Sequence, residues 1–242
     1  MQIFFQKHDL NVWLMPLFYL VLLFLGEISS TEVVILYALE TIVIGLSHVL
    51  KLLLLSLSAG LRKEKLLGIF YMVFFTFHYG IFVFVQTTFF FVFLSMGDPR
   101  ITADLGFGNF ATVLHFQGVQ NGLVFLTISY SFKFWFGFYR SQYYKTIDIQ
   151  SYFFQPYLRI FIQQFVAILP GFFIVFGKAD VAAAILLIFI RGFTDFYFDK
   201  MRTDPVYFKK AFNFLFNKKI NEGMNSEDRL EAENLLKIFL KG

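Results

Sequence analysis

Long, nearly uninterrupted apolar runs dominate the chain, and short polar connections separate them. Six of the runs are long enough to cross a bilayer, which takes about 20 mostly apolar residues. Barrel strands would instead alternate between apolar and polar positions over about ten residues. The pattern predicts an all-α polytopic membrane bundle of about six transmembrane helices. The expected spans cover about 10–25, 33–57, 66–94, 111–138, 157–176 and 181–198.

The pattern changes after the sixth run. Apolar residues recur at helical spacing between positions 207 and 216, and lysines lie among and after them. A second helical stretch is expected over 226–240, with Ser226 as its N-cap. Basic amphipathic helices of this kind are typical of segments that lie on anionic lipid headgroups. We therefore expect a transmembrane domain over 1–202 and a basic amphipathic cytoplasmic tail over 203–242; docking of a soluble partner is the alternative for this tail.

The basic residues of the connections gather on one side of the expected bundle. Lys and Arg precede the first span and follow the second, fourth and sixth, whereas only Arg100 and Lys178 lie on the other side. Because positively charged connections stay on the cytoplasmic side, both termini are expected there. This agrees with an even number of spans.

Composition supports the membrane setting and excludes several classes of protein. The chain has 242 residues, of which 57% are hydrophobic and 16% charged, whereas about a quarter of a soluble domain is charged. Disorder is excluded because it requires low hydrophobicity. The absence of Cys excludes disulfides and thiolate metal sites. No nucleic-acid partner is expected, since the basic residues follow the membrane side and form no reading motif.

Several ionisable or polar residues interrupt the apolar runs, and each costs a few kcal/mol inside a bilayer. In the second span, Tyr37, Glu40 and Lys51 fall along one stripe of a helix. Lys51 can extend to the surface, but the short side chain of Glu40 cannot. Glu40 is therefore expected to face the bundle interior, either protonated or paired.

Other spans contribute further candidates. Arg191 and Asp195 lie four residues apart in the sixth span and are expected to form a salt bridge. The alternative is that Asp195 interacts with His78 or with a metal ion. No metal site is predicted, although His78, Asp195 and Glu40 are weak candidate ligands, and no cofactor is indicated. The expected intramembrane polar cluster comprises Tyr37, Glu40, Lys51, His78, Gln86, Arg159, Arg191 and Asp195.

Short motifs occur in order along the chain. They are Tyr37-Ala38-Leu39-Glu40 with Lys51 about three turns later, His78-Tyr79-Gly80, Pro156-Tyr157-Leu158-Arg159-Ile160, and Arg191 four residues before Asp195. In these motifs, over about residues 33–202, the chain resembles an uncharacterised family of bacterial integral membrane proteins, a domain of unknown function. The resemblance implies a location in the bacterial inner membrane, but no reaction.

The chain also departs from the pattern that this resemblance implies. The family element Tyr-Trp-x-Glu has Trp where this chain has Ala38, and further His is expected at Gln86, Gln164 and Asp199. Gln does not replace imidazole as a transition-metal ligand. If relatives hold a metal or haem through these His residues, this chain has lost much of that site.

Three functions are compatible with these features. The first is proton or small-solute handling through a buried cluster of Glu40, His78, Arg191 and Asp195. The second is a membrane-embedded enzyme acting on a lipid-like substrate, with His78, Asp195 and Glu40 as acid–base groups or metal ligands. The third is a structural or assembly protein whose tail recruits a partner. A homo-oligomer remains open.

Overall fold

The computed structural model describes residues 7–104, 107–145, 147–150, 152–154, 156–157, 180–221 and 223–240. Within these ranges all regular structure is helical, which confirms the all-α prediction for this part of the chain. The helices are α1 (Lys7–Phe24), α2 (Ser30–Ser58), α3 (Arg62–Ser95), α4 (Phe107–Leu114), α5 (Gln117–Phe132), the π-helix η1 (Lys133–Arg140), the 3₁₀ turn η2 (Tyr143–Lys145), α7 (Asp180–Thr203), α8 (Pro205–Asn221) and α9 (Ser226–Leu240).

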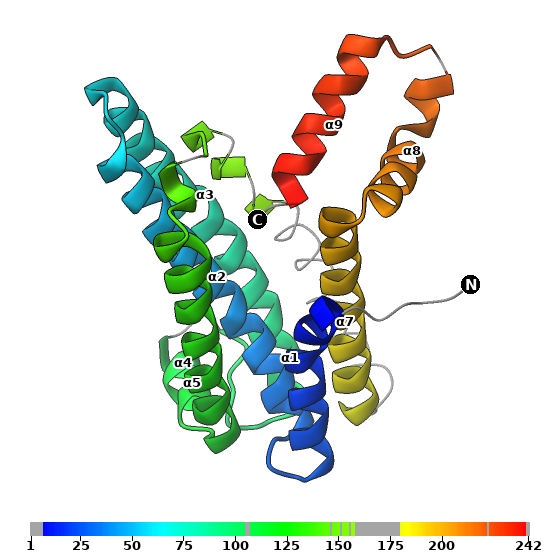
Figure 1. Cartoon of the computed structure of the whole chain (residues 1–242). Coiled ribbons are helices and arrows are strands. Elements are labelled where there is room, and N and C mark those ends of the chain that lie inside the picture. Colours follow the sequence, from blue (N-terminus) through cyan, green and yellow to red (C-terminus); the bar gives the residue numbers. More distant parts are fainter. Residues whose placement is uncertain are drawn as a thin grey trace.

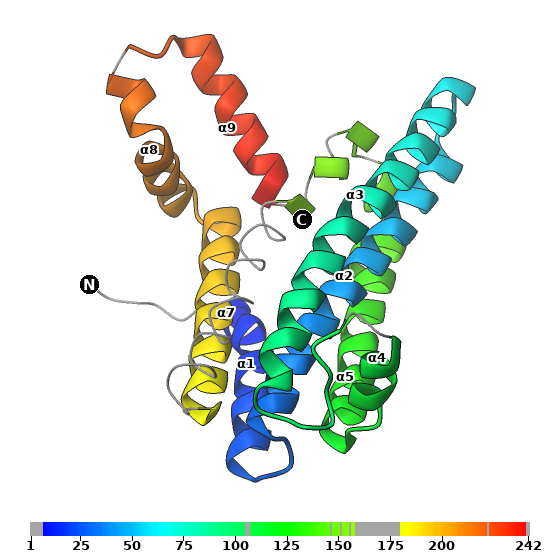
Figure 2. The ribbon, with the colours of Figure 1, turned by 180° about the vertical axis from the view of Figure 1, so that it is seen from behind.

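Helix α2 is the centre of the arrangement. It packs against α3, α5 and α7, while α1 lies mainly along α7 (Figure 1). Helices α8 and α9 form a hairpin that projects from the end of α7 (Figure 2). In the most apolar stretch of α2, 67% of the residues are buried inside the structure, whereas in that of α3 only 17% are buried. Helix α2 is therefore a core helix, and α3 presents an apolar face to the surroundings.

A capping box defines where α2 begins. The Ser29 hydroxyl accepts a hydrogen bond from the Glu32 backbone N–H at 3.2 Å, and the Ser29 N–H donates to Glu32 Oε2 at 2.7 Å. Glu32 Oε1 also accepts a hydrogen bond from the Gly118 N–H at 2.9 Å. One carboxylate thus joins the first turns of α2 and α5.

Small residues let α5 approach α2 closely. A Cβ atom added at Gly118 would lie 2.8 Å from Glu32 Cδ, and one added at Gly122 would lie 2.2 Å from Leu36 Cδ1. Glycines four residues apart bring two helix backbones together in the same way at the interfaces of membrane helices. This spacing fixes the α2–α5 contact.

Two of the described helices, α2 and α3, are long and apolar enough to cross a membrane. Six spans are therefore not confirmed, and the number six stays a prediction. The apolar part of α1, Trp13–Phe24, is shorter, and the expected fifth span lies outside the described residues except for Tyr157. Large apolar side chains on α3 are nevertheless exposed, as expected for a surface that faces lipid. They include Phe70, Phe77, Ile81, Phe84 and Phe89.

The expected fourth span over 111–138 differs from the structure, because the chain turns between α4 and α5. Helix α5 begins only at Gln117, and the Gln120 side chain donates to the Leu114 carbonyl at 2.9 Å across this turn. After Phe132 the helix continues with π winding. The two turn residues, His115 and Phe116, are neither Gly nor Pro, and Gly118 already lies within α5, which is why the sequence alone predicts one continuous helix.

The basic connections share one end of the molecule. Both ribbon views show the α2–α3 connection, η2 and the α8–α9 hairpin at this end, and the α1–α2 and α4–α5 turns at the other (Figures 1 and 2). Asp98 and Arg100 follow α3 at the second end and pair at 2.6 Å. The Arg100 guanidinium holds the pKa of the Asp98 carboxyl below its usual value. Arg100 also lies 4.2 Å from the centroid of the Phe116 ring, which ties this loop to the α4–α5 turn.

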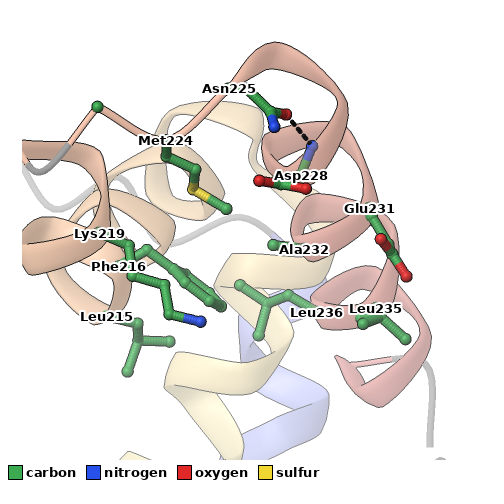
Figure 3. A pocket seen from close by; sticks show the side chains of 11 residues that line it. Leu215, Phe216, Lys219, Met224, Asn225, Asp228, Glu231, Ala232, Leu235 and Leu236 are labelled. Atoms are coloured by element: carbon green, nitrogen blue, oxygen red, sulfur yellow. Dashed lines mark hydrogen bonds between the residues drawn. The ribbon is translucent and has the colours of Figure 1, made fainter.

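The hairpin buries part of the apolar face expected to contact lipid. Phe208 and Phe212 of α8 pack with Leu236 and Leu240 of α9, together with partly buried residues near the end of α7. A hollow of about 850 Å³ lies between the two helices. Figure 3 shows Phe216, Met224 and Leu236 among the side chains that line it. Leu215 and Phe214 stay exposed.

The N-cap of α9 differs from the expectation. The Asn225 side-chain oxygen accepts a hydrogen bond from the Asp228 N–H at 2.7 Å, which places Asn225 in the capping position (Figure 3). Ser226 is the first helical residue.

Gly45 and Gly80 offer a matched test of the packing between α2 and α3. A Cβ on Gly45 would lie 2.0 Å from Tyr79 Cε1, whereas one on Gly80 meets no described atom within 4 Å. Gly45→Ala is expected to destabilise the protein by roughly 1–3 kcal/mol, because the buried ring must shift. Gly80→Ala is expected to be neutral or stabilising by up to about 1 kcal/mol. Thermal unfolding in one detergent measures both, and equal losses would contradict the packing.

Candidate functional site

A buried ion pair joins α2 to α7. The Glu40 side chain is 0% exposed, and that of Arg191 is 8% exposed. The two terminal nitrogens of Arg191 contact the two carboxylate oxygens of Glu40, so the pair is bidentate. The contact from Arg191 Nη2 to Glu40 Oε1 is a hydrogen bond, whereas Glu40 Oε2 and Arg191 Nε have no hydrogen-bond partner among the described residues. The buried stripe of α2, which includes Tyr37, Thr41 and Ile44, carries Glu40 into the interior.

Two further polar groups lie next to this pair. The Tyr130 hydroxyl of α5 donates a hydrogen bond to Glu40 Oε1 at 2.9 Å. Asp195, one turn after Arg191, has its Oδ2 3.7 Å from Arg191 Nε. The Asp195 side chain is 22% exposed. Arg191 therefore lies between one fully buried carboxylate and one that reaches the surface.

Tyrosine rings surround this cluster. The guanidinium carbon of Arg191 lies 5.8 Å from the centroid of the Tyr37 ring, within the range of a cation–π contact. Tyr19 of α1 lies close enough to Glu40 and Arg191 to interact electrostatically with both. Four helices, α1, α2, α5 and α7, thus contribute side chains to one buried site. We call Glu40, Tyr130, Arg191 and Asp195 the Glu40 cluster.

The structure does not bring His78 to the Glu40 cluster. Its Nδ1 atom lies 3.2 Å from the Tyr157 hydroxyl, and its ring stacks on Phe74 with centroids 5.3 Å apart. Tyr79 explains this placement, because it faces α2 and donates a hydrogen bond to the backbone carbonyl of Thr41. Successive side chains point about 100° apart around a helix, so His78 does not share the face of α3 on which Tyr79 contacts α2.

Other expected site residues lie elsewhere. Lys51 has its Nζ atom 5.7 Å from the centroid of the Phe138 ring, in the second apolar cluster. Gln86 is 4% exposed, and neither polar atom of its side chain has a hydrogen-bond partner among the described residues. Arg159 lies outside the described residues. Within the described ranges, no group of three His, Asp or Glu residues could hold a metal ion.

Tyr130 is the cluster residue that the sequence reasoning missed. A signal for it exists, because Gly118, Gly122, Leu126 and Tyr130 recur every four residues and are all buried. This spacing marks the face of α5 that contacts α2. The Tyr130 hydroxyl lies on this face of α5 and therefore reaches the polar side chain that α2 presents to it, Glu40.

A family model matches residues 7–211 of the chain. The chain belongs to DUF6498, a family of unknown function. The DUF6498 match covers the whole Glu40 cluster and ends within α8, so α9 lies outside it. It confirms the resemblance to an uncharacterised family and extends it beyond residues 33–202 at both ends. The motifs and the membrane setting of DUF6498 stay predictions. Comparisons with curated proteins and with solved structures returned no match.

The buried ion pair of this DUF6498 chain predicts which of two variants, a single and a double substitution, is the more stable. Arg191→Met leaves a buried Glu40 carboxylate without its cation, which is expected to cost about 3–5 kcal/mol. In the double variant Glu40→Leu/Arg191→Met, apolar side chains replace both charges, so the loss is expected to be smaller than in Arg191→Met alone. The unfolding midpoint of each variant in one detergent checks this. A double variant that is less stable than the single one would contradict the buried pair.

Proposed function

We propose that this protein is a multi-pass protein of the bacterial inner membrane, with both termini cytoplasmic, that moves protons or a small solute through the Glu40 cluster. The observation that carries the proposal is the position of Arg191 between the fully buried Glu40 and the partly exposed Asp195. Ionisable groups inside a membrane bundle commonly mark ion or proton pathways.

One guanidinium shared by two carboxylates supplies a simple exchange. Arginine stays charged in proteins, so proton exchange falls to the carboxylates. A proton that binds Asp195 removes its negative charge and leaves Arg191 to pair with Glu40. A proton that binds Glu40 instead releases Arg191 toward Asp195. The proton and the cation thus exchange positions without leaving two charges unpaired in the interior.

The two carboxylates differ in exposure and in the groups that contact them. Asp195 is partly exposed on α7, whereas Glu40 is covered and is contacted by Tyr130 of α5. Tyr130 also lines a groove between α2 and α5. A hydroxyl can accept one proton and donate another, so Tyr130 offers a second route to Glu40.

The membrane setting has its own support. Helices α2 and α3 meet the requirements for spans, and α3 exposes large apolar side chains over much of its length. The basic connections share one end of the molecule (Figure 1). Helix α8, which carries Lys209 and Lys210, lies near this end, where these lysines would meet anionic headgroups (Figure 1).

A flux assay tests the proposal. Proteoliposomes that contain a pH-sensitive dye are given a pH gradient, and the parent is expected to dissipate it several-fold faster than liposomes without protein. Glu40→Gln and Asp195→Asn are expected to return the rate to the protein-free value, because each removes one exchangeable carboxylate.

Asp199→Asn is the matched control for this assay. Asp199 lies one turn after Asp195 but pairs with Arg202 at 2.6 Å, so its removal should leave the flux unchanged. Size-exclusion profiles show whether each variant is folded. Flux that persists in both Glu40→Gln and Asp195→Asn would refute the proposal.

A purely structural role is the second candidate. The bidentate Glu40–Arg191 contact and the Tyr130 hydrogen bond favour it, because they tie α2, α5 and α7 together. In that case Glu40→Gln lowers stability while the parent shows no flux above the protein-free rate. An acid–base enzyme that uses His78 with Glu40 and Asp195 has less support, since His78 contacts Tyr157 instead.

A further inference from the structure

A groove of about 400 Å³ runs between α2 and the segment formed by α5 and η1. Its volume lies within the roughly 300–1,000 Å³ of typical ligand pockets. Leu46 and Leu50 of α2 line one wall, and Phe134 and Trp135 of η1 line the other. These four side chains offer a long apolar surface, which suits a hydrocarbon chain.

Hydroxyl groups interrupt this apolar lining. Ser47 lines the groove, and its Oγ atom is buried without a hydrogen-bond partner among the described residues. A buried hydroxyl without a partner is unfavourable, so the site gains when a ligand supplies an oxygen to it. Thr127 and Ser131 of α5 add two more hydroxyls to the opposite wall. The groove is therefore amphipathic, as a lipid is.

A cation lies beside the groove. The Lys133 Nζ atom is 4.8 Å from the centroid of the Tyr130 ring, and Tyr130 lines the groove. Lys133 is also the first residue of η1, directly before the lining residues Phe134 and Trp135. π-helical winding is rare and frequently occurs at functional sites. Here it places an exposed cation next to two aromatic lining residues.

We infer that this groove binds one acyl chain of an anionic phospholipid, whose phosphate pairs with Lys133 and whose glycerol or ester oxygens reach Ser47. An anionic headgroup complements Lys133 and the nearby Arg140 of the same π-helix. A zwitterionic phospholipid would place the same chain in the groove but carries no net charge to favour this position. The inference rests on the membrane setting proposed above. An acyl chain in the groove would cover the Tyr130 side of Glu40 and leave the access through the partly exposed Asp195 open.

The two tryptophans of the chain allow a direct test. Trp135 lines the groove, whereas Trp13 packs on α7 beside Phe193, so Trp13→Phe leaves one fluorophore at the site. The variant is reconstituted with a small fraction of phosphatidylglycerol or phosphatidylcholine, each brominated on its acyl chains, in an unbrominated background. One basic residue near an anionic membrane surface gains about 1 kcal/mol of binding free energy. Phosphatidylglycerol is therefore expected to bind about five-fold more tightly than phosphatidylcholine, as measured by the quenching of Trp135.

Two charge variants and one groove variant complete the test. Lys133→Gln is expected to abolish the preference for phosphatidylglycerol, whereas Lys145→Gln, a matched loss of charge on η2, leaves it unchanged. Ser47→Leu fills the groove and is expected to weaken quenching by both lipids. If Trp13→Phe does not fold, the difference between the parent and Trp135→Phe gives the same quantity.

Three outcomes would overturn the inference. Equal quenching by the two lipids means that the groove contacts bulk lipid only. An equal effect of Lys133→Gln and Lys145→Gln means that general surface charge sets the preference. Unchanged quenching in Ser47→Leu means that the acyl chain does not enter the groove.

A preference for phosphatidylglycerol without proton flux would refute the proposed function but leave the lipid site in place.

Discussion

The contact between Glu40 and Arg191 is the constraint on which the rest of this structure depends. Neither charge can be buried alone, because an unpaired ion in the interior costs several kcal/mol. The pair therefore determines how α7 is rotated against α2, since only one face of each helix brings the two side chains together. Tyr130 extends the same constraint to α5 through its hydrogen bond to Glu40. The packing of the apolar side chains follows from these two rotations.

Close backbone contacts hold the remaining helices around this centre. Gly118 and Gly122 let α5 reach α2, and Gly45 makes room for the Tyr79 ring of α3. At the start of α2, the Glu32 carboxylate serves both its own capping box and the first turn of α5. Polar groups are thus placed at the end and in the middle of the α2–α5 contact, and apolar surface fills the space between them.

Much of this arrangement is visible in the sequence, but the pairing is not. Helical periodicity predicts the stripe of α2 that carries Glu40. It also predicts that Arg191 and Asp195, four residues apart, lie on the same face of their helix. The sequence does not show which carboxylate pairs with Arg191, because this depends on contacts between helices that are distant in sequence. The closer partner is Glu40 of α2, not Asp195 of the same helix. His78 was expected beside Glu40, yet one turn of α3 can present only one face to α2, and Tyr79 occupies it. The α4–α5 turn was not predicted because its own residues, His115 and Phe116, are not helix breakers and the nearest glycine, Gly118, lies inside α5.

The separation of the ion pair along the chain has a consequence for the order in which the protein is made. Glu40 and Arg191 are 151 positions apart, so α2 is synthesised long before its cation exists. Until α7 follows, α2 lacks the cation that pairs with Glu40 in the finished structure. The acid of α2 therefore receives its cation only when α7 docks, and a chain that ends before Arg191 keeps a central helix whose buried carboxylate has lost this partner.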